Sequence, residues 1–164
     1  MPRWYAVLVK SQHERAVARD IEALGYEAFV PLYRSERRWS DRIKTLQLPF
    51  FPQYAFGRFP FAARTRVENL PGVRCLITFG KRAAPIPDEE IQALKAVAAS
   101  GLVVQPWPFL EVGDRVRIER GPLRGVQGIV QSVNKSLHLV VSVEMLKRSV
   151  AVKLERDMVT PAGR

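Results

Sequence analysis

The sequence predicts an α+β protein: an antiparallel sheet sandwiched by helices over residues 1–100, followed by a small β-barrel over residues 111–164. Three observations support this class. Strand-like and helix-like apolar patterns alternate over residues 1–100, and no helical period follows them. Short strands then recur at roughly the 8–12-residue spacing of a small barrel. Residues 101–110, where Pro106 and Pro108 flank Trp107, are expected to form a linker.

The chain is expected to begin with an apolar strand over residues 4–9 and a helix behind it. Ser11 and Glu14 have the spacing of a capping box, which marks a helix start. Gly25 is well placed to end the helix in the left-handed conformation. The apolar stripe of this helix consists of Val17, Ile21 and Leu24.

Two further strands are predicted over residues 26–33 and 48–59, with residues 34–45 as a polar connection between them. The second of these segments reads LPFFPQYAFGRF and is rich in aromatic side chains. Its prolines are tolerated where a strand begins or lies at a sheet edge. Alternation would place Phe51, Ala55 and Phe59 on a core face, and Phe50, Tyr54 and Phe56 on an outward face.

A short helix, another strand and a final helix complete the first part, in the order β-α-β-β-(short α)-β-α. Alternation over residues 73–79 predicts a strand that buries Val73, Cys75, Ile77 and Phe79. The acidic residues 88–90 favour the positive end of a helix dipole. The stripe of this last helix is Ile91, Leu94 and Ala98.

The barrel part consists of short apolar segments between turn signals. The strands are expected in DRVRIER, VQGIVQSV, LHLVVSV, SVAVKL and the terminal DMVT, with turns at GPLRG and NKS. The valines at 140, 141, 143, 150 and 152 lower helix propensity, so this part is expected to stay a barrel.

The composition indicates a basic, cytoplasmic protein. Lys and Arg number 26 against 16 Asp and Glu, a net charge of +10 with a pI near 10.4, which favours nucleic acid or a ribonucleoprotein as partner. The single cysteine, Cys75, fits a reducing compartment. No apolar run is long enough for a signal peptide or a membrane span, so no membrane association is expected.

Catalysis is not expected. His13 and His138 are far apart and lack His or Cys neighbours at metal-ligand spacing. Cys75 is interpreted as a small apolar side chain. The glycine-rich residues 121–128 lack the Lys-Ser/Thr ending of a phosphate-binding loop. The predictions are therefore no enzyme, no cofactor and no metal.

Residues 111–133, EVGDRVRIERGPLRGVQGIVQSV, resemble a KOW motif, an SH3-like β-barrel module of transcription elongation factors and ribosomal proteins. The segments WYAVLVKSQHE, LPFFPQYAF and PGVRCLITFGKRAAPIPDEEIQAL resemble the N-terminal domain of the NusG family, in the same order. The resemblance covers residues 4–159. It implies a NusG-family factor, either the general one or a specialised paralogue of the RfaH type.

The resemblance implies that the N-terminal domain, through an exposed apolar depression, binds the clamp helices of RNA polymerase. The residues that match are Phe51, Pro52, Tyr54 and Phe56, with Trp4 and Tyr5 as neighbouring candidates. Tyr54 and Phe56 are expected to face the partner. Gln53 departs from the family, which usually has glycine there.

The resemblance also places the polar connection near upstream and non-template DNA. Phosphate contacts are expected from Arg34, Arg37, Arg38, Arg42 and Lys44, although a solvated loop would explain the same charges. On the barrel, the family's Ile-Phe-Gly-Arg loop binds a small-subunit ribosomal protein or Rho. Its counterparts are Met145, Leu146, Lys147 and Arg148, which are alternatively barrel core at a strand end.

The function that follows is a monomeric transcription elongation or antitermination factor. It would bind RNA polymerase through its N-terminal domain, suppress pausing or termination, and use the KOW domain as an adaptor to the ribosome or the termination machinery. The alternative is a ribosome-associated KOW protein that binds RNA, because the net charge of +10 suits ribosomal RNA equally well. A ribosomal KOW protein has no need for residues 1–100, which favours the first reading.

Overall fold

The computed structural model describes residues 1–155, and the predicted strand over residues 157–160 lies outside them. The chain gathers into two compact units. One unit combines Met1–Val30 with Phe51–Asp88, and the other combines Pro31–Phe50 with the chain from Glu89 onward. These units divide the chain at other places than the predicted domain boundaries at residues 100 and 110, which stay predictions.

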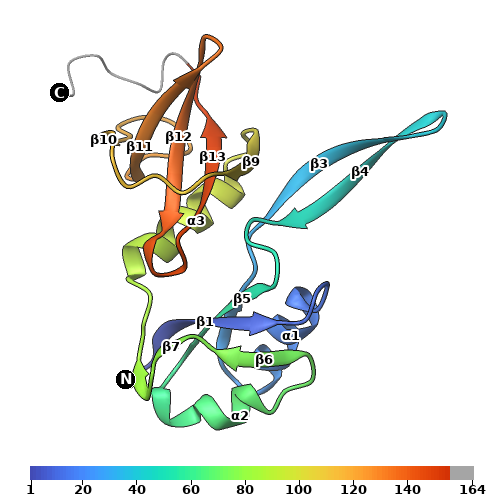
Figure 1. Ribbon diagram of the computed structural model, residues 1–164, viewed down its shortest axis with the longest axis vertical. Helices are drawn as coiled ribbons and strands as arrows, with labels where there is room; N and C mark the ends of the chain where they lie inside the picture. Colours follow the sequence, from blue (N-terminus) through green and yellow to red (C-terminus); the bar gives the residue numbers. More distant parts are fainter. Residues whose placement is uncertain (156–164) are drawn as a thin grey trace. The chain divides into compact units, whose positions relative to one another are not determined.

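The first unit is built on a four-stranded antiparallel sheet with the strand order β2-β5-β1-β6. Strands β5, β1 and β6 lie side by side in Figure 1. The predicted first strand is confirmed as β1, and the aromatic segment supplies β5, which pairs with β1 from Arg3 opposite Phe59 to Leu8 opposite Tyr54. The strands are β1 Arg3–Val9, β2 Glu27–Phe29, β5 Tyr54–Phe59 and β6 Val73–Leu76.

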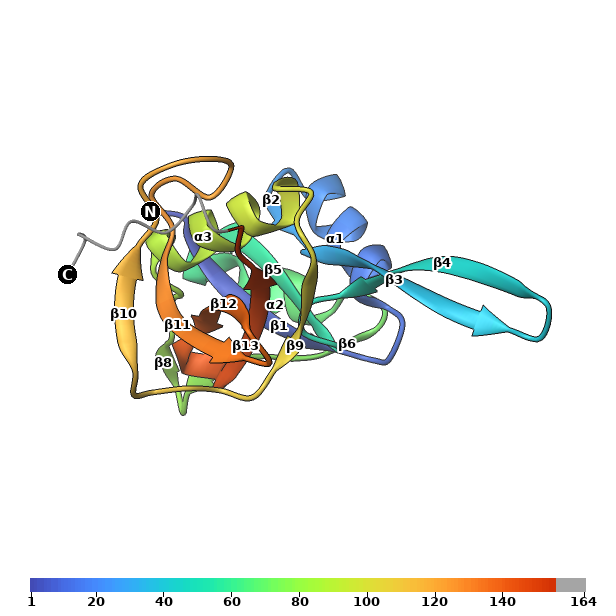
Figure 2. The same cartoon turned by 90° about the horizontal axis from the view of Figure 1, so that it is seen from above.

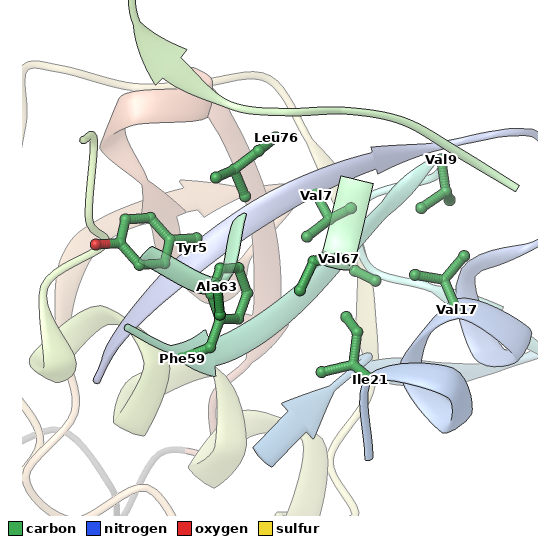
Figure 3. Packing of buried hydrophobic residues seen from close by; sticks show 10 residues of the cluster. Tyr5, Val7, Val9, Val17, Ile21, Phe59, Ala63, Val67 and Leu76 are labelled. Atoms are coloured by element: carbon green, nitrogen blue, oxygen red, sulfur yellow. The ribbon is translucent and has the colours of Figure 1, made fainter. Parts of the chain in front are cut away.

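Helices α1 (Glu14–Ala23) and α2 (Arg64–Glu68), with the 3-10 turn Phe61–Ala63 before α2, contribute to one core cluster with the sheet. Both helices therefore pack on the same face of the sheet, which we call the helix face. The side chains of this cluster interlock in Figure 3. They include Tyr5, Val7, Val17, Ile21, Ala55, Phe59 and Val67.

The boundaries of the first helix and of the second strand differ from the prediction. Helix α1 starts at Glu14 behind His13 without a side-chain cap, so the capping box at Ser11 is wrong. Its end is as expected: Gly25 has φ +95°, and its N–H donates to the Glu22 carbonyl at 2.9 Å. The strand expected over residues 26–33 is interrupted at Val30 and Pro31, because proline has no N–H to donate to a ladder.

The strand expected over residues 73–79 is also divided. Strand β6 ends at Leu76, and β7 (Thr78–Phe79) forms a small hairpin with β8 (Arg82–Ala83). The register against β1 shifts so that Val7 pairs with Leu76 and Val9 with Val73. One extra residue in a strand reverses the alternation beyond it. Leu76 is therefore buried in the core, whereas Phe79 is 64% exposed, contrary to the predicted buried face.

The second unit contains a long hairpin where a polar connection was predicted. Strands β3 (Leu32–Trp39) and β4 (Arg42–Pro49) pair along their whole length. Ser40 and Asp41 form the turn between them, with Ser40 at φ +46°. The two strands make a narrow ribbon that ends in this tight turn (Figure 2).

Helix α3 (Asp88–Ala99) confirms the final helix of the first part. Its buried residues are Ile91, Leu94 and Val97, while Ala98 is exposed, so the third stripe position was predicted one residue too late. No helix among residues 1–155 combines the length and apolarity that a bilayer crossing requires.

The remaining strands form a five-stranded antiparallel sheet with the order β10-β11-β12-β13-β9, which we call the C-terminal sheet. Four strands match predicted segments. The fifth, β9, lies within the residues expected to form a linker and pairs with β13 from Trp107 opposite Ser149 to Val104 opposite Val152. The bounds are β9 Val104–Trp107, β10 Asp114–Arg117, β11 Gln127–Val133, β12 Ser136–Val143 and β13 Arg148–Lys153, with a 3-10 turn at Glu144–Leu146.

Candidate functional site

The sheet of the first unit has a second face, opposite the helices, which we call the open face. The register of β1 and β5 assigns side chains to it, because directly paired residues of antiparallel strands project to the same side. Its central members are Trp4, Ala6, Leu8, Tyr54, Phe56 and Arg58. Phe29, which pairs with Phe56 from β2, belongs to the same face.

Phe56 is completely buried, so the expectation that its ring is uncovered is wrong. Its ring lies 6.4 Å from that of Phe29, and Phe51 packs edge-on at 6.3 Å. Phe51 itself is only 3% exposed. Tyr54 is half-buried, as are Phe29 and Leu8. The open face thus presents a partly exposed apolar rim around a buried Phe56.

Strand alternation assigned Phe51 to the core with Ala55 and Phe59, and this is corrected by its contact with Phe56. The strand begins only at Tyr54, and the preceding residues form a turn in which the Tyr54 N–H donates to the Phe51 carbonyl at 3.1 Å. Period-2 alternation does not continue through a turn, so Phe51 folds over the open face. Pro52 is exposed in this turn.

A buried carboxylate holds this turn in place. Gln53 has φ +72°, and its N–H donates to Glu14 Oε2 at 2.8 Å, while its carbonyl accepts from the Val9 N–H at 2.9 Å. Glu14 is 7% exposed although it lies in the first turn of α1. Sequence reasoning interpreted Glu14 only as a helix cap and missed this role, since its partner is 39 positions away.

The two candidates on β1 project to opposite faces of the sheet. Tyr5 is 1% exposed and lies on the helix face, where its ring is 5.1 Å from that of Phe59. Trp4 is 2% exposed and lies on the open face, next to the strand position of Arg58. Trp4 therefore shares a face with Tyr54 and Phe56, and Tyr5 does not.

All five basic candidates of the predicted connection lie on the β3–β4 hairpin. Pairing divides them between its two faces, because Arg37 pairs with Lys44 and Trp39 with Arg42, while Arg38 pairs with Ile43 and Arg34 with Gln47. One face therefore carries Arg37, Arg42 and Lys44 around Trp39. The other carries Arg34 and Arg38.

The four candidates on the C-terminal sheet lie at one bend between β12 and β13. Met145 and Leu146 are half-buried in the 3-10 turn, and Lys147 and Arg148 are exposed. Lys147 is left-handed with φ +53°. Its Nζ lies 3.2 Å from Glu111 Oε1 and 5.1 Å from the ring centre of Phe109.

Comparison with known proteins settles the family. The model described as "Transcription termination factor nusG" matches residues 2–95. The chain belongs to the NusG family. This is a family of transcription factors and not an enzyme family. Within residues 1–155, no group of three or more His, Cys, Asp and Glu side chains is placed to hold a metal ion.

Relatives of this NusG-family chain match it over nearly its whole length. The transcription termination/antitermination protein NusG of Buchnera aphidicola is 30% identical over 93% of this chain and 92% of its own length. That of Escherichia coli K12 is 29% identical over 98% and 96%. A solved structure of domain interaction in Thermotoga maritima NusG covers 96% of both chains with a TM-score of 0.59 at 23% identity, a likeness that concerns the fold.

Two residues of this NusG-family chain that differ from the expected family sequence have a left-handed backbone conformation. Gln53 and Lys147 stand where the resemblance leads us to expect glycine, and both have positive φ. Glycine adopts this conformation without the steric cost that a Cβ adds. A glycine at residue 53 or 147 would therefore avoid a steric cost that Gln53 and Lys147 carry in this chain.

His138 is a buried titratable group of the C-terminal sheet. It is 6% exposed, its ring lies 4.9 Å from that of Trp107, and its Nδ1 has no hydrogen-bond partner. Burial, with a smaller effect from the Lys153 ammonium, lowers the pKa of His138 below its usual 6.5. Gln131, the residue of β11 that pairs with His138, accepts a 2.6 Å hydrogen bond from Trp107 Nε1.

The lowered pKa of His138 predicts that acid destabilises the NusG-family chain. Below pH 6.5 the unfolded state binds a proton that the folded state resists, so stability falls as pH decreases from about 7 towards the depressed pKa. His138→Phe should flatten this part of the curve, measured by urea unfolding between pH 5 and 7.5. Equal pH slopes for both proteins would contradict the prediction.

Protonation of Glu90 has the opposite effect on the pH dependence of stability, so its contribution has to be distinguished from that of His138. Burial raises the pKa of Glu90 above 4.5, so the folded state takes up a proton more readily and gains stability as pH falls towards 4.5. Glu90 is present in both the wild type and His138→Phe. The difference between their stability curves therefore isolates the histidine.

Proposed function

We propose that this chain is a transcription elongation and antitermination factor that binds RNA polymerase through the open face of its N-terminal sheet. The observation that carries the proposal is the half-buried rim of Tyr54, Leu8 and Phe29 around the buried Phe56. Aromatic anchors next to a desolvated apolar centre are typical of interaction hot spots. Family membership supports polymerase as the partner, and the resemblance indicates the clamp helices as the docking element.

Tyr54→Ala tests this proposal. Truncation of an aromatic hot-spot residue costs about 2 kcal/mol or more of binding free energy. We therefore expect the affinity for core RNA polymerase to fall at least roughly 30-fold. The matched control is Tyr26→Ala, since Tyr26 is also half-buried but packs towards Phe59 on the helix face, at 6.0 Å between ring centres. Circular dichroism would verify that both variants remain folded.

Retained binding by folded Tyr54→Ala would mean that the open face is not the docking surface. Binding lost equally in both tyrosine variants would point to a general loss of packing. If the wild type co-sediments with ribosomes and does not bind polymerase, the alternative of a ribosome-associated RNA-binding protein replaces this proposal.

We further infer that the β3–β4 hairpin contacts nucleic acid phosphates through Arg34, Arg37, Arg38, Arg42 and Lys44. Several cations on a narrow ribbon suit upstream or non-template DNA beside a bound polymerase. Charge reversal at Arg37, Arg38 and Arg42 should weaken the elongation complex. It should also lower the dependence of log affinity on log salt by about 0.9 per lost duplex phosphate contact. An unchanged salt slope would exclude these contacts.

The C-terminal sheet is proposed to be an SH3-like KOW barrel that serves as an adaptor, with Met145, Leu146, Lys147 and Arg148 as its contact loop. The loop combines a half-buried apolar pair with an exposed arginine. Binding of the full chain to a small-subunit ribosomal protein and to Rho, compared with Arg148→Ala, tests the assignment. Undiminished binding of either partner would place the contact elsewhere.

The departure of Leu146 and Lys147 from the family's loop distinguishes the two partners. Leucine offers no aromatic ring to either partner, and Lys147 is already engaged by Glu111. We therefore propose that Rho binding is weaker than in general NusG proteins, as in a specialised paralogue of the RfaH type. Rho affinity equal to that of a general NusG protein would contradict this.

A further inference from the structure

The two faces of the β3–β4 hairpin differ in charge. The face of Trp39 carries Arg37, Arg42 and Lys44, and its other positions are Tyr33, Ser35, Leu46 and Leu48. None of these is acidic. On the opposite face, Glu36 accompanies Arg34 and Arg38. The phosphate-binding capacity of the hairpin is therefore concentrated on the Trp39 face.

The cations of this face are free to meet a ligand. Within residues 1–155, no carboxylate forms an ion pair with Arg37, Arg42 or Lys44. Arg37 pairs directly with Lys44 across the hairpin, and Lys44 Nζ lies 5.0 Å from the centre of the Trp39 ring. Like charges held together without an acid repel one another, and a bound polyanion would relieve that repulsion.

Trp39 is unusually exposed to solvent for a tryptophan. It is 54% exposed, in contrast to Trp4 at 2%. The Lys44 ammonium can occupy only one side of its indole ring, so the other side is available for stacking. Successive side chains on one side of a strand are about 6.8 Å apart, which puts Arg37 and Trp39 within the reach of neighbouring nucleotides.

We propose that the Trp39 face binds single-stranded DNA, with a base stacked on the Trp39 ring and the flanking phosphates bound by Arg37, Arg42 and Lys44. The proposal rests on the nucleic-acid contact proposed above and names its substrate class. An exposed ring among cations is the combination with which proteins bind single strands, because every base offers a π-face. Sequence preference is not required.

Duplex DNA is expected to bind this face less tightly than a single strand. Its bases are stacked on one another and offer no free ring surface to Trp39, so only the three cations would contribute. A two-stranded ribbon can enter a major groove, which makes duplex binding the competing outcome. The two modes differ in how much affinity depends on the indole.

The experiment measures binding of the full chain to a labelled 12-nucleotide single strand of mixed sequence and to the matching duplex, by fluorescence anisotropy at several salt concentrations. Trp39→Ala should weaken single-strand binding about 10-fold, within the range of one base–aromatic stack. It should change duplex binding less than about 2-fold and leave the salt slope unchanged, because no phosphate contact is lost. Trp39→Phe should retain most of the affinity.

Ile43→Ala is the matched control. Ile43 is 65% exposed near the same hairpin end but on the opposite face, where it pairs with Arg38. We expect less than about 2-fold change from it on either substrate. Trp39→Ile preserves an apolar, strand-forming residue without a π-face, so it should bind as weakly as Trp39→Ala even if alanine frays the hairpin.

Wild-type affinity in Trp39→Ile, or no binding of the wild type to the single strand at low salt, would overturn the proposal. Equal losses on single strand and duplex would also overturn it, in favour of groove binding. Its failure is distinguishable from that of the proposed phosphate contact. If Arg37, Arg38 and Arg42 reversal lowers the salt slope while Trp39 variants bind normally, the phosphate contact stands and stacking is wrong.

Discussion

Gly128→Ala is expected to destabilise the C-terminal sheet strongly. A Cβ at residue 128 would lie 2.5 Å from the carbonyl oxygen of Val140 and 3.0 Å from a Leu139 methyl carbon. The carbonyl belongs to β12, which pairs with β11 immediately beside this position, where Ile129 faces Val140. Neither strand can retreat without breaking the ladder, so we expect a loss of about 3 kcal/mol or more in urea unfolding.

Gly125→Ala is the control for that prediction. Gly125 has φ +88° but no atom within 4 Å of an added Cβ, so it carries only the conformational cost, about 1–2 kcal/mol. Gly128 has no positive φ, so a stability loss in Gly128→Ala no larger than that in Gly125→Ala would contradict a severe clash with β12.

Phe59→Ala is expected to destabilise the first unit by about 3–5 kcal/mol, measured by urea unfolding. Phe59 is fully buried and lies between Tyr5 at 5.1 Å and Tyr26 at 6.0 Å, measured between ring centres. Removing the ring leaves a cavity in the core of Figure 3 that both helices and the sheet line. The surrounding side chains can relax only in part.

Phe79→Ala makes the same chemical change at a surface position. Phe79 is 64% exposed in β7, so we expect its loss to change stability by less than about 0.5 kcal/mol. A cost for Phe79→Ala similar to that of Phe59→Ala would contradict the assignment of the core to the helix face.

The hairpin shows why part of the fold could not be read from the sequence. Period-2 alternation reveals a strand only when one of its faces is buried. The outer half of β3–β4 is exposed on both faces, with Trp39 and Ile43 among the most exposed apolar side chains. Without a buried face, its charged residues have the composition of a solvated loop. The basic candidates could be proposed from charge alone, but their division between two faces required the register.

The open face illustrates the same limit for the candidate site. The sequence identified Tyr54 and Phe56 as the outward side of their strand, and the register places them together. It could not show that Phe51 leaves the strand at a turn and covers Phe56, or that Glu14 stabilises this turn. These contacts join residues that no local pattern relates.

The sequence by itself determined the family and the order of the main elements, because these follow from local periodicity and motif spacing, and its charge and aromatic content suggested candidate residues for a partner. Only the tertiary structure decided which of those side chains are buried and which share a face. Burial depends on the neighbours that distant segments supply, and a face depends on strand register, since a shift of one residue exchanges the two sides of a strand.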